Sequence, residues 1–449
     1  MTFEEVRNRA KLPPPEEEHH PGPPPGWVPP PPPPEMEPEC EAVISGSLRA
    51  DGETLTFKPG KASGEALSDV TISSDADNES AVYARGGAKL VLEDAVIEKN
   101  GGAQVRAVKD SEGKDIMLPM LRGINSAVLA NGEGTEIRLQ DCQILSRCTP
   151  GDMALEAANG VFTVFRGKAY LDRVNIELDG GFGHGLYDTQ FGTIYADDCR
   201  IVTTGHCASA LATDNPGGDL FIRNTSTLCT GPASAGVYVD GGSHAEIYSC
   251  HLASVQGEGA ALCNDGYLYI ADTLLRGTIG AKIWQPIARP GRMELDRCTL
   301  VSTTDSAFIF DGGYGTVVMD ACMVSPAPGQ CAIEARRCPQ HYDHIADGTA
   351  ILKNCSITGD IAATDDCSLA VKLENTDVLG QMHHVDLDVG YGSRVVFTGD
   401  SQLATLKVVE LESLSAVCPC TVTYVPTEGG LDGEYVLDNL ILKPVKGGE

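Results

Sequence analysis

Residues 246–275 read "EIYSCHLASVQGEGAALCNDGYLYIADTLL", and one short pattern occurs twice within them. In "EIYSCHL" and "LYIADTLL", an apolar strand-like run is followed by Ser or Asp, a small residue, a spacer and an aliphatic residue. The two small residues, Cys250 and Thr273, are 23 residues apart. A structural unit that recurs at such a period indicates a solenoid, in which each unit packs on the next.

Eleven copies of the pattern run along the chain, from "LVLEDAVI" (90–97) to "KLENTDV" (372–378). When they are aligned on the small residue, the central copies are 27, 24, 23, 25 and 24 residues apart. A second strand-like word precedes each copy. Two or three short strands per period are what one coil of a parallel β-helix needs, because a coil buries its apolar side only by stacking on its neighbours. The predicted fold is therefore an all-β solenoid.

The aligned small residues are predicted to form a ladder in the solenoid interior. Six of them are cysteine, and a free cysteine packs like a small hydrophobic residue. Sixteen cysteines in a chain without a visible export signal indicate free thiols. We therefore predict a structural role for the ladder, which consists of Ala95, Cys142, Val174, Cys199, Ser226, Cys250, Thr273, Cys298, Cys322, Cys355 and Thr376.

The formal net charge is −30, which repels nucleic acids and anionic membranes. The first residues, "MTFEEVRNRA", contain no apolar signal-peptide core, and no stretch approaches the 18 apolar residues of a membrane span. We therefore predict a cytoplasmic protein that binds neither nucleic acid nor membrane.

Three regions are predicted along the chain. Residues 1–40 are rich in Pro and Glu and form an extended arm, in which Trp27 is a candidate anchor onto a folded neighbour. Residues 41–400 form the β-helix. Residues 401–449 lose the coil period and form a short β segment that caps the solenoid or contacts a partner subunit. A homo-oligomer through the arm or the C-terminal segment remains an open alternative.

On its coil period and its ladder, the chain resembles the right-handed parallel β-helix, or pectate-lyase-like, superfamily over roughly residues 60–400. The resemblance implies a right-handed solenoid. It leaves the reaction open, because lyases, glycoside hydrolases, epimerases, phage tailspikes and adhesins share this fold. The strings "GHG" (183–185) and "DD" (197–198) resemble two motifs of polygalacturonase-type hydrolases. They occur in the reverse order and no R-x-K follows, so we interpret the match as chance.

Side chains alternate across a strand, so the strand-like segment that precedes each copy of the ladder pattern has an inner and an outer set of side chains. Leu186, Leu211, Val237, Leu262, Ile283 and Phe308 are predicted to point inward. The outer face then offers small residues, aromatic rings and a rim of carboxylates, which suit the rings and hydroxyls of a sugar. The predicted substrate-binding residues are Asp188, Tyr238, Asp240, Asp265, Lys282 and Trp284, with Arg337 and His341 from a later loop.

Two histidines lie among these positions. His184 begins the strand that carries Tyr187, and His206 lies in the loop before the strand that leads to Asp214. Since adjacent coils are about 4.8 Å apart, the four groups are expected to be neighbours. A histidine, a tyrosine and a carboxylate make a proton-transfer set. The predicted catalytic residues are His184, Tyr187, His206 and Asp214, with a histidine as the base and Tyr187 or a protonated Asp as the acid.

The loop "GQCAIEARRCPQHYDHIAD" (329–347) is predicted to cover the outer face as a clamp, with Arg336, Arg337 and His341 supplying positive charge. Cys331, Cys338, His341 and His344 are the alternative, a zinc site, but C-x₂-H-x₂-H departs from the usual ligand spacing. We predict no metal there. No G-x-G-x-x-G after a strand, P-loop or G-x-S-x-G is present, so we expect no cofactor.

Together these features predict a cofactor-independent acid–base enzyme of the isomerase, epimerase or lyase type. Its expected substrate is a small polyhydroxylated molecule such as a sugar derivative, an oligosaccharide or a phenolic compound. The alternatives are a glycoside hydrolase of the same superfamily and a non-catalytic carbohydrate-binding or adhesin β-helix.

Overall fold

The computed structural model describes residues 45–52, 54–57, 66–102, 108–109, 115–117, 122–147, 158–214, 217–284, 290–338 and 344–445. These ranges contain β-strands, one 3₁₀ turn (Leu411–Ser413) and no α-helix. None of their helical segments is long and apolar enough to cross a membrane. The predicted arm, residues 1–40, lies outside the described residues.

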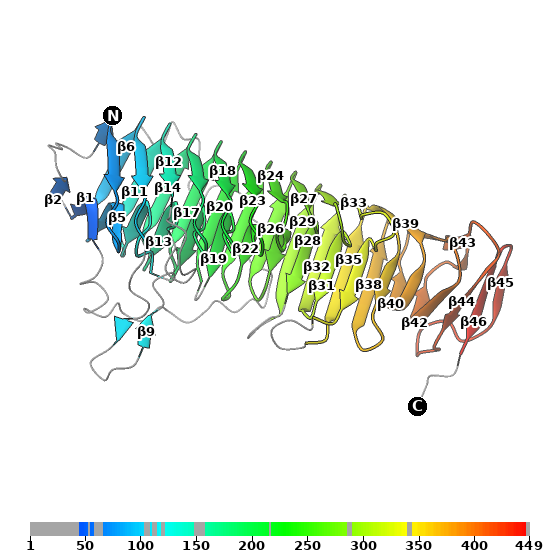
Figure 1. The fold of residues 1–449 in the computed structure, drawn as a ribbon. Helices are drawn as coiled ribbons and strands as arrows, with labels where there is room; N and C mark the ends of the chain where they lie inside the picture. The colour runs from blue at the N-terminus through cyan, green and yellow to red at the C-terminus, as the bar shows by residue number, and fades with distance from the viewer. Residues whose placement is uncertain are drawn as a thin grey trace. The chain divides into compact units, whose positions relative to one another are not determined.

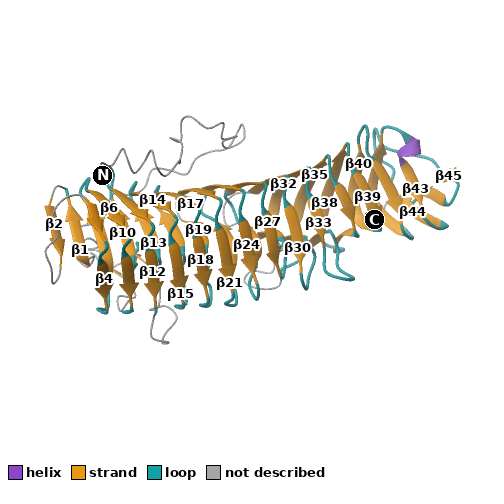
Figure 2. Ribbon diagram, turned by 90° about the horizontal axis from the view of Figure 1, so that it is seen from above, coloured by secondary structure: helices purple, strands orange, loops and turns teal. Residues whose placement is uncertain are grey.

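The chain divides into two compact units, residues 1–258 and 259–449. In the first unit each coil contributes one strand to each of three parallel rows (Figures 1 and 2). The first row is β1 (Ser45–Asp51), β5 (Glu79–Arg85), β10 (Val128–Asn131), β13 (Val161–Val164), β16 (Leu186–Thr189), β19 (Leu211–Asp214) and β22 (Ala235–Val239). The second is β3 (Ala66–Ser68), β6 (Lys89–Glu93), β11 (Glu136–Gln140), β14 (Lys168–Asp172), β17 (Thr193–Asp197), β20 (Asp219–Arg223) and β23 (His244–Tyr248). The third is β4 (Thr71–Ser74), β7 (Val96–Lys99), β12 (Gln143–Ser146), β15 (Asn175–Leu178), β18 (Arg200–Thr203), β21 (Ser226–Cys229) and β24 (His251–Ser254). Outside the rows, β2 (Thr54–Phe57) pairs antiparallel with β1, and β8 (Val108–Lys109) with β9 (Asp115–Met117).

The second unit repeats this arrangement. Its first row is β25 (Gly259–Cys263), β28 (Ala281–Trp284), β31 (Phe308–Asp311), β34 (Ile333–Arg336) and β37 (Ile361–Ala363). The second is β26 (Tyr267–Ala271), β29 (Gly291–Asp296), β32 (Tyr314–Asp320), β35 (Asp347–Lys353) and β38 (Ser368–Glu374), and β40 (Met382–Val389) then continues both rows. The third is β27 (Leu274–Gly277), β30 (Thr299–Ser302), β33 (Met323–Ser325), β36 (Ser356–Thr358), β39 (Asp377–Gly380), β41 (Arg394–Phe397) and β43 (Leu414–Ala416). A small C-terminal sheet follows, of β42 (Ser401–Val408), β44 (Cys420–Tyr424), β46 (Leu440–Pro444) and the antiparallel β45 (Tyr435–Leu437). The predicted parallel β-helix solenoid is confirmed.

Eleven of the described coils turn from the second to the third row through two residues. The first has a left-handed backbone with φ between 48° and 54°, and the second is the small ladder residue, whose side chain is buried. Asn and Asp tolerate a left-handed backbone better than other non-glycine residues, which explains their frequency at this corner. The corner residues are Asp94, Asp141, Arg173, Asp198, Asn224, Ser249, Asp272, Arg297, Ala321, Asn354 and Asn375.

One ladder position differs from the prediction. Asn224 takes the left-handed backbone, so the next residue, Thr225, is in the ladder, and Ser226 begins β21 with an exposed side chain. Thr225 Oγ1 accepts a hydrogen bond from the Cys199 backbone N–H (3.3 Å), and the Thr225 N–H donates to Cys250 Sγ (3.4 Å). The word "NTS" contains two small residues, and the sequence alone did not show which of them follows the corner.

The cysteines of the ladder are buried and chemically quiet. Burial raises the pKa of the Cys142 thiol to about 11 and that of Cys199 to about 12. Both Cys142 and Cys298 donate weak hydrogen bonds from Sγ to backbone carbonyls of the preceding coil, Leu92 at 3.4 Å and Ile270 at 3.3 Å respectively. The predicted interior position of these thiols is confirmed.

Replacing Ala321 with glycine is expected to stabilise the protein by about 0.5–1 kcal/mol. Ala321 is an exposed corner residue with φ 51°, a backbone that costs a non-glycine residue about 1–2 kcal/mol and costs glycine little. Urea unfolding measures the change. Ala370→Gly in the extended strand β38 is the control, and it should destabilise instead. A loss of stability in Ala321→Gly would show that the corner is not strained.

On the outer side of the second row in the first unit, Tyr170, Tyr195 and Phe221 stack in one column, hereafter the aromatic column. The ring centroids are 5.0 Å and 4.9 Å apart, and the rings are within 11° of parallel. Beside it, His244 contacts Phe221 edge-on, and its ring nitrogens lie 3.3 Å from Asp219 and 3.0 Å from Glu246. The contact between His244 Nε2 and Glu246 Oε1 is close enough for an ion pair but does not have the geometry of a hydrogen bond.

This histidine predicts a pH dependence of stability. Burial opposes the charge on His244, but Asp219 and Glu246 outweigh it and raise its pKa to about 9. Because the folded pKa lies above the unfolded value near 6.5, the stabilisation is complete below about pH 6.5 and is lost as pH rises through about 9. The loss should be about 3 kcal/mol. Urea unfolding from pH 6 to 10 measures it, and an equal slope in His244→Gln would contradict the assignment.

Candidate functional site

Two phenol–carboxylate pairs lie on successive coils of the first unit. On the outer side of the first row, Tyr187 of β16 and Tyr238 of β22 flank Ala212 of β19 in one column. The Tyr187 hydroxyl donates a hydrogen bond to Asp214 Oδ2 (3.3 Å), and the Tyr238 hydroxyl donates to Asp240 Oδ2. These four residues are named here the phenol–carboxylate quartet.

The quartet is partly accessible and holds its phenols protonated. Tyr187 and Asp240 are buried, whereas Asp214 and Tyr238 are half-buried. Burial and then the neighbouring carboxylates, Asp214 first among them, raise the pKa of both phenols well above 10. The phenols are therefore hydrogen-bond donors at neutral pH, and the carboxylates are the acceptors. Asp214 and Tyr238 are the members that solvent or a ligand can reach.

His184 lies against this quartet but is not arranged as a base. Its ring contacts Tyr187 edge-on at 4.5 Å, and its Nδ1 accepts a hydrogen bond from the Ser209 backbone N–H at 3.1 Å. That bond places the ring proton on Nε2. Burial lowers the pKa of His184 to about 4, so the ring is neutral near pH 7 and its acceptor nitrogen is already engaged. The geometry supports an orienting role for His184 rather than the predicted proton removal.

The structure does not bring His206 or Asp188 into the quartet. His206 is half-buried in the turn before β19, and its ring contacts Phe182 edge-on at 5.9 Å. Asp188 alternates to the inner side of β16, where its exposed fraction is 0% and its Oδ2 accepts a hydrogen bond from Thr213 (3.2 Å). Burial raises the pKa of Asp188 well above its usual value. Asp188 therefore cannot contact a ligand bound at Asp214 and Tyr238 without rearrangement.

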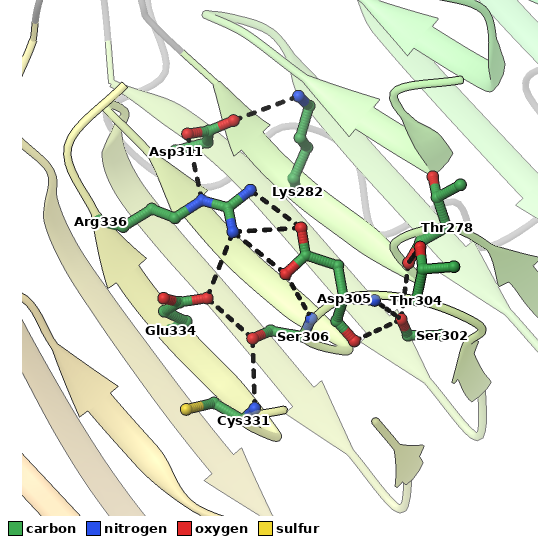
Figure 3. A network of polar contacts seen from close by, with 10 residues as sticks. All are labelled: Thr278, Lys282, Ser302, Thr304, Asp305, Ser306, Asp311, Cys331, Glu334 and Arg336. Carbon is green, nitrogen blue, oxygen red and sulfur yellow. Dashed lines mark hydrogen bonds and ion pairs between the residues drawn. The ribbon is translucent and has the colours of Figure 1, made fainter. Parts of the chain in front are cut away.

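In the second unit a charged network lies on the outer side of the first row (Figure 3). Lys282 Nζ is 3.4 Å from Asp311 Oδ2, and Arg336 Nε is 3.5 Å from Asp311 Oδ1. Arg336 also makes three contacts of 3.1 Å with Asp305 and approaches Glu334 at 3.5 Å. Among the described residues two cations thus face three carboxylates, so the network has no excess positive charge for an anionic ligand.

Of the other predicted binding residues of this unit, Trp284 lies beside the network. The Trp284 ring is 5.4 Å from Lys282 Nζ, a cation–π contact. Arg337 is exposed and pairs with Asp366 at 2.6 Å, so it is Arg336 and not Arg337 that shares the Asp311 carboxylate with Lys282. Asp265 is buried in the turn between β25 and β26. His341 lies outside the described residues.

The register of this row corrects the predicted inner set. Leu262 pairs with Lys282, and Lys282 with Ile309, so Leu262 belongs to the outer column. Ile283 instead pairs with Cys263 and Phe310. The short connection between β25 and β28 shifted the alignment by one residue. In the first unit the predicted inner column Leu186, Leu211 and Val237 is confirmed by register and full burial.

Sequence reasoning missed Asp305, Ser306 and Glu334, which complete the network. Ser306 Oγ donates to Glu334 Oε2 at 2.8 Å and accepts from the Cys331 backbone N–H at 3.2 Å. One feature of the sequence could have indicated a charged network here: Lys282, Asp311 and Arg336 alternate in charge and are each about one coil apart.

The two motif-like strings belong to the scaffold. His184 of "GHG" is buried, and Asp198 of "DD" is a left-handed corner residue. Asp197 accepts hydrogen bonds from Arg223 (3.0 Å) and Asn224 (2.7 Å) of the next coil. The alternative zinc set includes Cys338 and His344, which are joined by a backbone bridge. Within the ranges that the structure describes, no group of three or more His, Cys, Asp or Glu side chains is arranged to hold a metal ion.

Fold and site together define a parallel β-helix protein with an acidic, tyrosine-containing outer face. No protein-family model matches the chain, and a search of curated proteins finds no match. The pectate-lyase-like resemblance therefore extends to the architecture of stacked parallel coils and no further.

Proposed function

We propose that this protein is a cofactor-independent acid–base enzyme that acts on a small, neutral, polyhydroxylated substrate in the cytoplasm. An isomerase or epimerase is the preferred type, and a lyase is the related alternative. The observation that carries the proposal is the quartet, in which two protonated phenols donate hydrogen bonds to two carboxylates on successive coils. Carboxylates accept hydrogen bonds from sugar hydroxyls, and neutral phenols donate them.

The proposed roles follow from exposure and protonation. Asp214, half-buried, removes a proton from the carbon next to a substrate carbonyl and returns it when the resulting enol collapses, so no proton is gained or lost overall. Tyr238, kept protonated, turns from Asp240 to the substrate and donates a hydrogen bond to the carbonyl oxygen as negative charge develops there. Tyr187 positions Asp214, and His184 packs against Tyr187.

A neutral substrate fits the charges of both units. The quartet contains two of the carboxylates of a chain whose net charge is −30, and the cations of the Lys282 network are engaged by Asp305, Asp311 and Glu334. An anionic substrate would meet repulsion at the quartet.

The test is proton exchange in D₂O with a panel of neutral aldoses, ketoses and phenolic glycosides, followed by NMR. An enzyme of the proposed type exchanges the hydrogen next to the carbonyl for deuterium, and Asp214→Asn should abolish the exchange. Saturable binding without exchange would support the alternative carbohydrate-binding β-helix, and incorporation of oxygen from ¹⁸O-water would support a glycoside hydrolase. An exchange that survives in Asp214→Asn would overturn the assignment of the base.

A further inference from the structure

The centre of the aromatic column is buried although it lies on the outer side of the solenoid, and the flanking rings of Tyr170 and Phe221 are half-buried. Tyr195, its central ring, is 5% exposed. Arg138 continues the column at one end, with its guanidinium 4.1 Å from the Tyr170 ring centroid, and is 1% exposed. Glu246 continues it at the other end and is 0% exposed. Rings stacked side by side cover one another's faces but leave their outer edges open, so burial to this degree requires a cover.

We propose that the Pro-rich segment of the same chain, residues 12–38, docks along the aromatic column as a polyproline strand. Of its 27 residues 14 are proline, six of them in the run 29–34. Polyproline segments dock on surfaces lined by aromatic rings, because the pyrrolidine rings pack against them and the preformed helix loses little entropy. Proline also lacks a backbone N–H, so such a cover does not leave donors unpaired over a sheet face.

The position and length of the segment suit this occupant. It precedes β1, the first strand of the first row, and the aromatic column lies in the same unit. From Arg138 on β11 to Glu246 on β23 the column spans four coil steps, about 19 Å. A polyproline helix rises about 3.1 Å per residue, so the run 29–34 alone covers nearly the same length. Attachment to β1 also gives the segment a millimolar effective concentration, which favours its own chain over a second copy.

The charges of the segment agree with the arginine end of the column. Residues 16–18, 35, 37 and 39 are glutamates, and Arg138 and Lys168 lie on the outer face of neighbouring second-row strands. A glutamate brought near Arg138 would be attracted to its positive charge.

Photo-crosslinking in the full-length chain tests the proposal directly. p-Benzoylphenylalanine is placed at Trp27 or at Met36, one position at a time, and crosslinked peptides are identified by mass spectrometry from an equal mixture of light and isotope-labelled protein. At least one probe should crosslink to peptides containing residues 168–223, and both partners should carry the same isotope label. Crosslinks only elsewhere would overturn the proposal, and mixed-isotope products would assign the cover to a second copy.

Fluorescence gives a second, independent readout. The chain has two tryptophans, Trp27 and Trp284, so Trp284→Phe leaves Trp27 as the only indole. In this background Tyr195→Ser should raise the acrylamide quenching constant of Trp27 at least twofold, whereas Tyr391→Ser, at an exposed tyrosine (74%), should leave it unchanged. Equal quenching in both variants, with unchanged circular dichroism, would contradict docking on this column.

Discussion

Replacing Tyr238 with phenylalanine is expected to lower the turnover of the proposed enzyme about 10²–10³-fold, the usual cost of losing one donor to a developing oxyanion. The affinity for substrate should change far less, because the ground-state carbonyl carries little charge. The measurement is kcat and KM for the substrate that shows proton exchange in D₂O, together with its Kd from equilibrium titration.

The physical reason lies in what the substitution removes. Phenylalanine keeps the ring packed where Tyr238 packs against Tyr187 and Ala212, and deletes only the hydroxyl. Asp240 still accepts a hydrogen bond on Oδ1 from the Gly241 backbone N–H (2.7 Å), so the carboxylate is not left without a donor. The site therefore stays folded while losing the group that would face the developing charge.

Tyr248→Phe provides a matched control. Tyr248 is also a half-buried tyrosine of the first unit, and its hydroxyl donates to Glu246 Oε2 at 2.8 Å. It belongs to a different strand row, so turnover should be unchanged. Full activity in Tyr238→Phe, or an equal loss in both variants, would remove Tyr238 from the mechanism and leave the quartet as a binding site.

The repeat made the fold predictable, because the same physical requirement recurs in every coil. A left-handed corner and a small interior residue follow eleven of the second-row strands, as in the sequences "EDA", "QDC", "DRC" and "KNC". Where two small residues adjoin, as at Thr225 and Ser226, the sequence leaves the register open by one position. The backbone conformation of Asn224 then decides it.

The candidate site was predictable in its tyrosines and in Asp214 and Asp240, because alternation and coil spacing set them on one outer face. The roles of the two histidines could not be predicted from the sequence. Sequence places His184 next to Tyr187, but only the structure shows that Ser209 of the next coil occupies its Nδ1 and that burial keeps the ring neutral. Likewise, alternation turns Asp188 inward, whereas its position beside a turn suggested an exposed carboxylate.

Replacing Gly231 with alanine is expected to destabilise the protein by roughly 3 kcal/mol, the upper range for forcing a methyl group into a packed interior. Gly231 lies in the turn that follows β21 and is buried. A Cβ atom there would lie 1.8 Å from the Gly205 carbonyl oxygen of the preceding coil, and a Cβ on Gly205 would lie 2.0 Å from the Gly180 oxygen. Urea unfolding measures the loss.

The obstacle is backbone, which cannot rotate away as a side chain can. The separation of the two coils is held on either side of Gly231 by hydrogen bonds from the Thr230 N–H to the Thr203 carbonyl (2.9 Å) and from the Cys207 N–H to the Pro232 carbonyl (3.0 Å). Accommodating the methyl group therefore means lengthening these bonds. Hydrogen exchange at the Thr230 amide should rise in the variant, which locates the damage at this turn.

Gly87→Ala separates steric from conformational cost. Gly87 has φ +77°, and a methyl group there would meet no atom within 4 Å beyond its chain neighbours. The loss of stability in Gly87→Ala therefore comes only from the left-handed backbone and should be about 1–2 kcal/mol. Gly231 has no such backbone, and its cost is contact alone. If close stacking of the coils limits this fold, Gly231→Ala must be the more destabilising of the two. A smaller loss than in Gly87→Ala would mean that neighbouring coils can separate at little cost, and the rigid spacing that brings Tyr187, Asp214 and Tyr238 together would have to be abandoned as well.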